Sequence, residues 1–244
     1  MNDTEVKKLA EVLKNANNTY VLTGAGMSTE SGIPDFRSQG TGLWNEIDPI
    51  KYATRDVLMS EPEKFFQVTF KRFASLVDKK PNEGHYVLSE LEKEGIINGI
   101  ITQNIDGLHQ EAGSKEVWEV HGNIKKSHCM ECNTAYPFEE LVSQVEIKDV
   151  PECKECGGVI RPDVVLFGDP MPDDFFEIAA ELKQNCDFLL IVGTSLQVYP
   201  VAGIAELGVP MGIINLDSTP HDVKAKAVIN TKCSQALKQI KECL

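Results

Sequence analysis

The sequence predicts an α/β fold with a doubly wound, mostly parallel sheet and a smaller lobe set into it. Three observations predict this class. Short and almost entirely apolar runs, typical of strands buried on both faces, alternate with helical patterns. A Gly-x-Gly turn follows the first of these runs. Two Cys-x-x-Cys pairs interrupt the alternation in the middle of the chain.

The predicted elements follow from periodicity and from the residues that break it. Asp3–Asn15 has apolar residues at helical spacing after cap candidates, so it is predicted as the first helix. Glycine, proline and asparagine divide the remaining chain into further elements. The other predicted helices are 62–77, 86–94 and 173–184, and 81–85 is predicted as a break. The predicted strands are 20–23, 96–102, 117–120, 161–167, 188–192 and 211–215.

Two segments depart from the alternation and predict how the lobes divide. A chain of 244 residues can bury one large core or two small ones. We assign the large, Rossmann-like lobe to residues 1–38, 82–121 and 161–244 of a single catalytic domain. The smaller lobe combines a helical insertion at 39–81 with the cysteine-bearing segment 122–160.

Composition and charge exclude several classes of protein. The formal net charge is −13 and the pI is about 4.9, whereas a protein that binds nucleic acid through its phosphates needs a basic face. No apolar run approaches the ~20 residues of a membrane span, and the N-terminus has no signal-peptide pattern. We therefore predict a cytoplasmic protein that binds neither nucleic acid nor membranes.

The two cysteine pairs have the spacing of a zinc site. Cys129 and Cys132 form the first pair, and Cys153 and Cys156 form the second. Each pair presents two thiolates, and four thiolates complete a tetrahedral Zn²⁺ shell with no position left for water. Two unrelated redox or buried pairs are the alternative. The sequence therefore predicts one structural zinc ion, held in a zinc ribbon, with neighbouring His128 outside the ligand set.

The run from Gly24 to Arg37 is the most informative segment of the chain. A Gly-x-Gly turn leaving a buried strand lets a phosphate approach the backbone and the N–H groups of the next helix. Thr29 occupies the position where a hydride-transfer fingerprint has its third glycine. The run therefore predicts nucleotide binding joined to a chemistry other than routine hydride transfer.

Polar residues follow four predicted strands, where ligands of open α/β sheets bind. One group is Gln103, Asn104, Ile105 and Asp106, for which an Asx-rich turn that caps a helix is the alternative. His121 follows the strand 117–120 and is suited to general base catalysis. The remaining two groups are Gly193, Thr194 and Ser195, and Asn215, Leu216 and Asp217, whose residue types suit a ribose or adenine.

Taken together, these motifs resemble those of the sirtuins, which are NAD-dependent protein lysine deacylases. The resemblance runs in order through the Gly24–Arg37 run, the Thr102–Asp106 run, His121-Gly122, the cysteine pairs and the last two polar strand ends. It implies a protein lysine deacetylase that transfers the acetyl group of acetyl-lysine to ADP-ribose and releases nicotinamide. NAD is then a consumed co-substrate, and the partners are acyl-lysine proteins or peptides.

The resemblance also implies roles for individual residues. His121 and Asn104 would be the catalytic residues, with His121 as the general base, and Asn104 and Asp106 would line the nicotinamide pocket. The other implied NAD-binding residues are Gly24, Ala25, Gly26, Thr29, Asp35, Phe36, Arg37, Gln103, Ile105, Gly193, Thr194, Ser195, Asn215, Leu216, Asp217, Lys232 and Cys233. Val165, Leu166, Phe167 and Gly168 would pair with the substrate peptide by β-addition.

The sequence also predicts an acyl preference and leaves three alternative functions open. Sirtuins that favour acidic acyl groups resemble one another in a Tyr-x-x-Arg pair. In this chain the two positions hold Thr69 and Arg72, so the tyrosine is missing. The segment Tyr52-x-x-Arg55 has the same spacing, but it lies ahead of the helix where the pair is expected. We therefore expect deacetylation rather than desuccinylation. A mono-ADP-ribosyltransferase, deacylation of other acyl-lysines and a zinc-ribbon module that only senses NAD are the alternatives.

Overall fold

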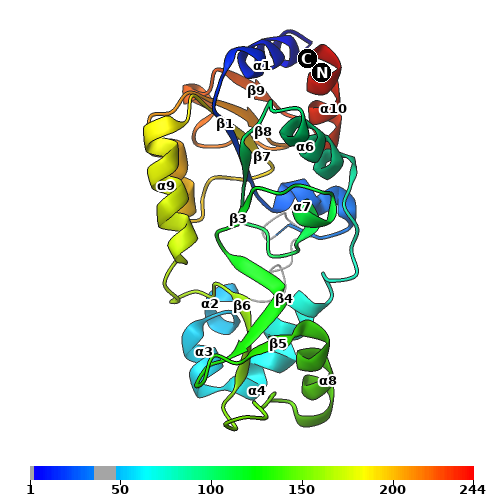
Figure 1. Ribbon diagram of the computed structural model, residues 1–244, viewed down its shortest axis with the longest axis vertical. Helices are drawn as coiled ribbons and strands as arrows, with labels where there is room; N and C mark the ends of the chain where they lie inside the picture. Colours follow the sequence, from blue (N-terminus) through cyan, green and yellow to red (C-terminus); the bar gives the residue numbers. More distant parts are fainter. Residues whose placement is uncertain (1–2, 36–47) are drawn as a thin grey trace.

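A six-stranded parallel sheet forms the centre of the computed structural model, which describes residues 3–35 and 48–244. Its order is β3-β2-β1-β7-β8-β9, with every neighbouring pair parallel (Figure 1). The strands are β1 (Thr19–Thr23), β2 (Gly99–Thr102), β3 (Val117–Glu119), β7 (Phe188–Val192), β8 (Met211–Ile214) and β9 (Ala227–Ile229). The doubly wound parallel sheet predicted from the sequence is confirmed.

Helices cover both faces of this sheet, which explains why its strands are apolar along their whole length. On one face lie α1 (Asp3–Asn15), α6 (Glu83–Lys93) and α10 (Cys233–Cys243). On the other lie α9 (Asp173–Asn185) and the 3-10 helix η3 (Val201–Glu206). Within β1, Val21 packs into the first core, whereas Tyr20 and Leu22 pack into the second.

The strand order places a topological switch point at the middle of the sheet. From β1 the chain moves outward through β2 and β3, and it later returns to build β7, β8 and β9 on the other side of β1. The turns that leave β1 and β7 therefore meet. Gly24 N donates to Val192 O at 3.1 Å, and Gly26 N donates to Gly193 O at 2.8 Å. Ligands of doubly wound sheets bind in the crevice beyond such a point.

A second, antiparallel sheet occupies the opposite end of the molecule (Figure 1). It consists of β5 (Ala135–Pro137), β4 (Gly122–Cys129) and β6 (Ile160–Val164), in that order. A separate apolar core joins it to the surrounding helices and includes Phe65, Phe66 and Phe70. These helices are α2 (Pro49–Tyr52), α3 (Arg55–Ser60), α4 (Pro62–Lys64), the π-helix η2 (Phe65–Phe70), α5 (Lys71–Ala74) and α8 (Phe138–Lys148). The division of the chain into lobes at the predicted residues stays a prediction.

The prediction that the α/β alternation resumes with strand 161–167 is wrong. Residues Ile160–Val164 form β6, which pairs antiparallel with β4 and not with the parallel sheet. The burial of β6 alternates, with Ile160, Pro162 and Val164 buried and Arg161 and Asp163 half-buried. That period-2 pattern is typical of a sheet with one buried face.

Three further elements differ from their predicted form. The segment after Gly24 is the 3-10 helix η1 (Ala25–Ser31), which ends at left-handed Gly32. Helix α6 begins at Glu83 inside the predicted break, because the side chain of Asn82 caps it by accepting from Gly84 N at 2.9 Å. Helix α8 lies between the two cysteine pairs and was not predicted, although Phe138, Leu141 and Val145 bury one face of it. The connecting helices α7 (Leu108–Glu111) and η4 (Asp222–Lys224) are short.

None of the helices in the described ranges combines the length and the apolar character needed to cross a membrane. The cytoplasmic location stays a prediction.

Candidate active site

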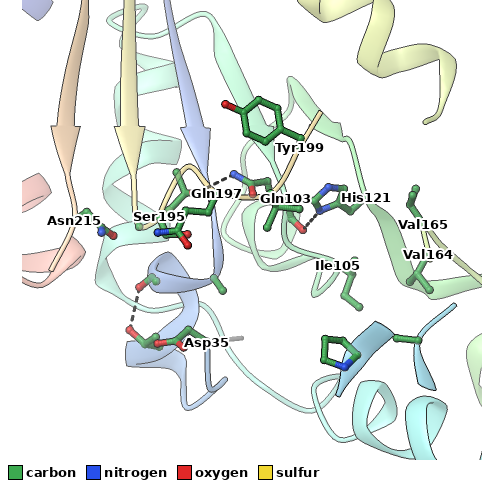
Figure 2. A pocket seen from close by; sticks show the side chains of 18 of the residues that line it. Asp35, Gln103, Ile105, His121, Val164, Val165, Ser195, Gln197, Tyr199 and Asn215 are labelled. Atoms are coloured by element: carbon green, nitrogen blue, oxygen red, sulfur yellow. Dashed lines mark hydrogen bonds between the residues drawn. The ribbon is translucent and has the colours of Figure 1, made fainter. Parts of the chain in front are cut away.

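A cavity of about 920 Å³ lies beyond the carboxyl ends of β1, β2, β7 and β8 (Figure 2). All four predicted polar strand ends reach it: Gln103 after β2, His121 after β3, Gly193 after β7 and Asn215 after β8. The half-buried His121 lines it from the other side. Other predicted residues lining it are Ala25, Gly26, Thr29, Asp35, Ile105, Val165, Leu166, Phe167, Gly168, Thr194, Ser195, Leu216, Asp217, Lys232 and Cys233.

The Gly-x-Gly turn is required by close backbone contact at the switch point. A Cβ atom on Gly24 would lie 2.6 Å from Thr194 Cβ, and one on Gly26 would lie 2.9 Å from Gly193 Cα. Real Cβ atoms do not approach other heavy atoms that closely, so a side chain at either position would push the two turns apart. The glycines therefore hold the two turns together at the rim of the cavity, with Gly24 itself outside the lining.

His121 presents one ring nitrogen as a proton acceptor. Its Nδ1 lies 3.0 Å from the carbonyl oxygen of Gln103. A carbonyl can only accept, so Nδ1 carries the proton and donates, which leaves the Nε2 lone pair for the cavity. Burial lowers the pKa of His121, and the hydrogen bond to Gln103 opposes this in part. The neutral, basic form of the ring is therefore the dominant one at neutral pH.

Asn104 and Asp106 line a smaller cavity that shares Ala25 and Ile105 with the main one. Ser28 connects them, because its Oγ donates to Asp106 Oδ2 at 2.7 Å and accepts from Asn104 Nδ2 at 3.1 Å. Asp106 also accepts from Leu108 N at 2.9 Å. Burial raises the pKa of Asp106, and these two hydrogen bonds partly oppose the rise.

The side-chain amide of Asn104 is held in place by hydrogen bonds from its nitrogen, whereas its oxygen lacks a hydrogen-bond partner among the described residues. Its Nδ2 also donates to Gly24 O at 3.1 Å, which fixes the amide plane. Its Oδ1 is buried and has no hydrogen-bond partner within residues 3–35 and 48–244. An unpaired buried acceptor costs free energy, so its persistence at a binding site points to a ligand that donates to it.

The far end of the main cavity is built from the strand ends of β7 and β8 and the start of α10. Gln103 Nε2 donates to Thr194 Oγ1 at 3.0 Å, which joins the ends of β2 and β7 (Figure 2). Asn215 Nδ2 donates to Asp217 O at 2.8 Å and holds the loop after β8. Leu216 is 65% exposed although it lines the cavity, as expected of a side chain available to pack on a flat ring.

Several lining residues were not predicted, and two predicted residues lie outside the described part of the chain. Phe36 and Arg37 belong to the latter group. The unpredicted ones are Pro49, Ala53, Phe73, Val164, Asp169, Met171, Gln197, Val198, Tyr199, Pro200, Ser218 and Thr231. Most lie in loops without a polar strand-end pattern. Ser28 was identifiable from its place in the Gly24–Arg37 run.

The four cysteines of the two pairs come together at one end of the small sheet. Their sulfur atoms all lie within 4.8 Å of one another, with 3.4 Å between Cys129 and Cys156 and 3.5 Å between Cys132 and Cys153. Bonds of about 2.3 Å in a tetrahedral zinc site put the sulfurs about 3.8 Å apart, so this donor set fits zinc. His128 contacts Asp163 instead of joining the cluster. A closed four-sulfur shell makes the zinc structural.

Two buried histidines lie behind the site. His85 on α6 and His109 on α7 pack against each other with their rings tilted by 57° and the ring centroids 4.8 Å apart. His109 Nε2 lies 2.9 Å from Thr23 Oγ1, and that hydroxyl donates to Thr102 Oγ1 at the end of β2. Burial lowers the pKa of His85 to about 4 and that of His109 well below its usual range. Both rings are therefore neutral in the folded protein.

These two histidines predict acid sensitivity of the fold. In the unfolded chain each ring binds a proton near pH 6.5, so stability is full above that pH and is lost as the pH falls toward 4. For His85 alone the free energy of unfolding should fall by about 1.5 kcal/mol between pH 6.5 and pH 5. Urea unfolding at these two pH values measures the loss. A His85→Gln variant should show a shallower pH dependence, and an unchanged slope would contradict this assignment.

The switch-point cleft and the cysteine cluster define the chain as a doubly wound nucleotide-binding protein with a structural zinc module. A family model described as the Sir2 family matches residues 24–200. The chain therefore belongs to the Sir2 (sirtuin) family.

Curated relatives and solved structures agree with this membership over nearly the whole chain. A Caldanaerobacter subterraneus subsp. tengcongensis relative named NAD-dependent protein deacetylase 2 is 52% identical over 235 residues, which cover 96% of this chain and 94% of the relative. The NAD-dependent protein deacetylase of Clostridium perfringens is 42% identical, with 98% and 99% covered. A Sir2 structure with deacetylated p53 peptide and 3′-O-acetyl ADP-ribose has a TM-score of 0.92 at 36% identity, with 97% of both chains covered. Sir2Tm bound to a propionylated peptide has a TM-score of 0.87 at 36% identity, with the same coverage.

Proposed function

We propose that this protein is an NAD-dependent protein lysine deacetylase, which transfers the acetyl group of acetyl-lysine to ADP-ribose. The observation that carries the proposal is His121: a neutral imidazole whose Nδ1 is tied to Gln103 O and whose Nε2 faces a nucleotide cleft. The names of the relatives, and the acetyl-ADP-ribose and peptide in the similar structure, support the same reaction. Acyl-lysine proteins or peptides are the partners.

The cleft fits NAD by its size, its place and its unsatisfied acceptor. It lies at the switch point, where the Gly24 turn and the end of β7 meet, and Asn104 Oδ1 is left unpaired beside it. We assign the pyrophosphate to the Gly24–Gly26 turn and Thr29, the adenosine end to Ser195, Asn215 and Leu216, and the nicotinamide to Asn104 and Asp106. Bound NAD supplies the ribose carbon that receives the acyl oxygen as nicotinamide leaves.

The residues of the chain contribute orientation and proton transfer. The hydrogen bonds from Asn104 to Ser28 and from Ser28 to Asp106 fix the groups around the small cavity before any substrate binds, which reduces reorganisation during reaction. His121 Nε2 accepts the proton of a ribose hydroxyl, and the Gln103 carbonyl stabilises the resulting imidazolium through Nδ1–H. The hydroxyl oxygen would then take up the acyl group, the lysine nitrogen would leave it as the free amine, and water would supply the balancing oxygen and protons.

Release of nicotinamide tests this proposal directly. Nicotinamide should form from NAD only when an acetyl-lysine peptide is present, and the unacetylated peptide is the matched control. A module that only senses NAD would release none with either peptide. Release that is equal with both peptides would favour an ADP-ribosyltransferase or simple NAD hydrolysis instead.

The acyl preference is a second expected result. The tyrosine position of the pair holds Thr69, so no phenol is present there to bind a carboxylate. The side chain of Thr69 is buried and donates to Tyr52 O at 2.7 Å. Arg55 of the Tyr52-x-x-Arg55 pattern has its Nε 4.0 Å from Asp169, and Arg72 donates to Val68 O. We expect deacetylation to be faster than desuccinylation on peptides of the same sequence. A faster desuccinylation rate would refute this preference.

A further inference from the structure

A largely buried ion pair, Arg161 with Asp169, lies at the wall of the cleft just after β6. Both terminal nitrogens of Arg161 contact the carboxylate of Asp169, with Nη1–Oδ1 at 3.1 Å and Nη2–Oδ2 at 2.6 Å. The side chains are only 11% and 9% exposed. Such a bidentate salt bridge fixes the relative orientation of the guanidinium and the carboxylate as well as the distance between them. The pair therefore holds the start and the end of the segment Val164–Asp169 in one arrangement.

The same two side chains also bind the backbone between them. Arg161 Nη2 donates to Val164 O at 2.8 Å, and Asp169 Oδ2 accepts from Leu166 N at 2.9 Å. The backbone N–H of Asp169 donates to Leu166 O at 3.0 Å. The ion pair and the turn it encloses thus form one connected unit.

Further hydrogen bonds determine which backbone groups stay open. Phe167 N donates to Ala53 O at 3.0 Å, Arg55 N donates to Phe167 O at 2.9 Å, and Val165 N donates to His121 O at 2.9 Å. Within Val165–Gly168, the groups with no partner among the described residues are the Val165 carbonyl and both backbone groups of Gly168. The segment is therefore a shaped turn with a few open groups at the cleft, and not a free strand edge.

We propose that Arg161 and Asp169 are positioning residues for peptide recognition, which act by presenting the open backbone groups of Val165 and Gly168 to an acyl-lysine peptide. Asp169 does not present a free charge, because Arg161 neutralises it and Arg55 approaches it from the solvent side at 4.0 Å. The pair acts through the backbone that it shapes. This inference rests on the proposed function, since it assigns the peptide wall of the same cleft.

The Asp169→Asn variant tests the proposal with little change in side-chain shape. We expect the KM for an acetyl-lysine peptide to rise about tenfold or more, with the KM for NAD nearly unchanged, because a small misplacement of binding groups is enough for such a loss. Asp169→Glu, which keeps the charge, should recover part of the peptide affinity. Asp174→Asn removes a carboxylate from the exposed first turn of α9 and is the matched control.

Direct binding of a fluorescent acetyl-lysine peptide, followed by anisotropy, separates failure of the two proposals. If the wild-type protein binds the peptide but releases no nicotinamide, the proposed function fails, while the weaker binding of Asp169→Asn still supports the positioning role. Arg161→Lys should weaken peptide binding as well. Because it changes the other partner of the ion pair, the same result in both variants cannot come from a folding defect of one of them. A lower melting temperature with unchanged peptide KM and affinity in both variants would overturn the inference.

Discussion

The His121→Ala variant is expected to bind NAD with close to wild-type affinity and to lose most of its turnover. His121 lies beside the cleft with its Nδ1 proton committed to Gln103 O, so only Nε2 is available to accept a proton. Removing a positioned general base typically costs 10²–10⁴-fold in rate, which is about 3–5 kcal/mol in the activation barrier. Steady-state kinetics with saturating acetyl-lysine peptide, together with calorimetric titration of NAD, measures the two quantities separately.

The pH profile of the wild-type enzyme provides an independent check of the same role. Burial lowers the pKa of His121, so its neutral form persists below the pH at which an exposed histidine becomes protonated. The acid limb of kcat/KM should therefore fall at a pH below about 6.5, and it should vanish from the residual activity of His121→Ala. Added imidazole should restore part of the lost rate. Full activity of the variant would refute the base role.

The Cys129→Ala variant is expected to lose its metal and to unfold the region built on the small sheet. Zinc in small sites contributes apparent free energies of about 10–16 kcal/mol, which is as large as the stability of a whole domain. Cys129 lies at the end of β4 inside the apolar core that includes Phe66 and Ile160. Loss of the site thus exposes that core. Metal content by atomic emission and thermal unfolding by circular dichroism measure the effect.

The matched control for the metal site is Cys243→Ala. Cys243 is an exposed free cysteine at the end of α10, and the same substitution there should leave metal content and melting temperature unchanged. Chelation of the wild-type protein should reproduce the Cys129→Ala defect. One bound zinc per chain in a fully folded Cys129→Ala variant would contradict the structural role.

The elements that could be predicted are those whose structure depends on their own local sequence and not on contacts with distant parts of the chain. Strand β7 and helix α1 have the predicted bounds, because one is an uninterrupted apolar run and the other has a single apolar stripe. The prediction for β6 was wrong because an apolar run does not specify which sheet it joins. The early start of α6 depends on a cap from Asn82, whose amide also contacts Met27 O across 55 residues.

The residues of the site likewise fall into those that the sequence pattern predicts and those that it does not. Polar groups at strand ends were predictable, because the parallel sheet brings Gln103, Thr194 and Asn215 to one edge. Residues such as Tyr199 and Met171 carry no pattern of their own and reach the cleft only through the path of their loops. The Arg161–Asp169 pair joins residues eight positions apart across a turn, and nothing in their spacing marks it.

Mass spectrometry of the complete reaction tests the central claim most directly. The wild-type protein, NAD and an acetyl-lysine peptide should give three products in equal amounts: nicotinamide, deacetylated peptide and O-acetyl-ADP-ribose. The acetyl group should appear on the ADP-ribose and not as free acetate in the first turnovers. ADP-ribosylated peptide that keeps its acetyl group, or an unchanged peptide, would contradict the account.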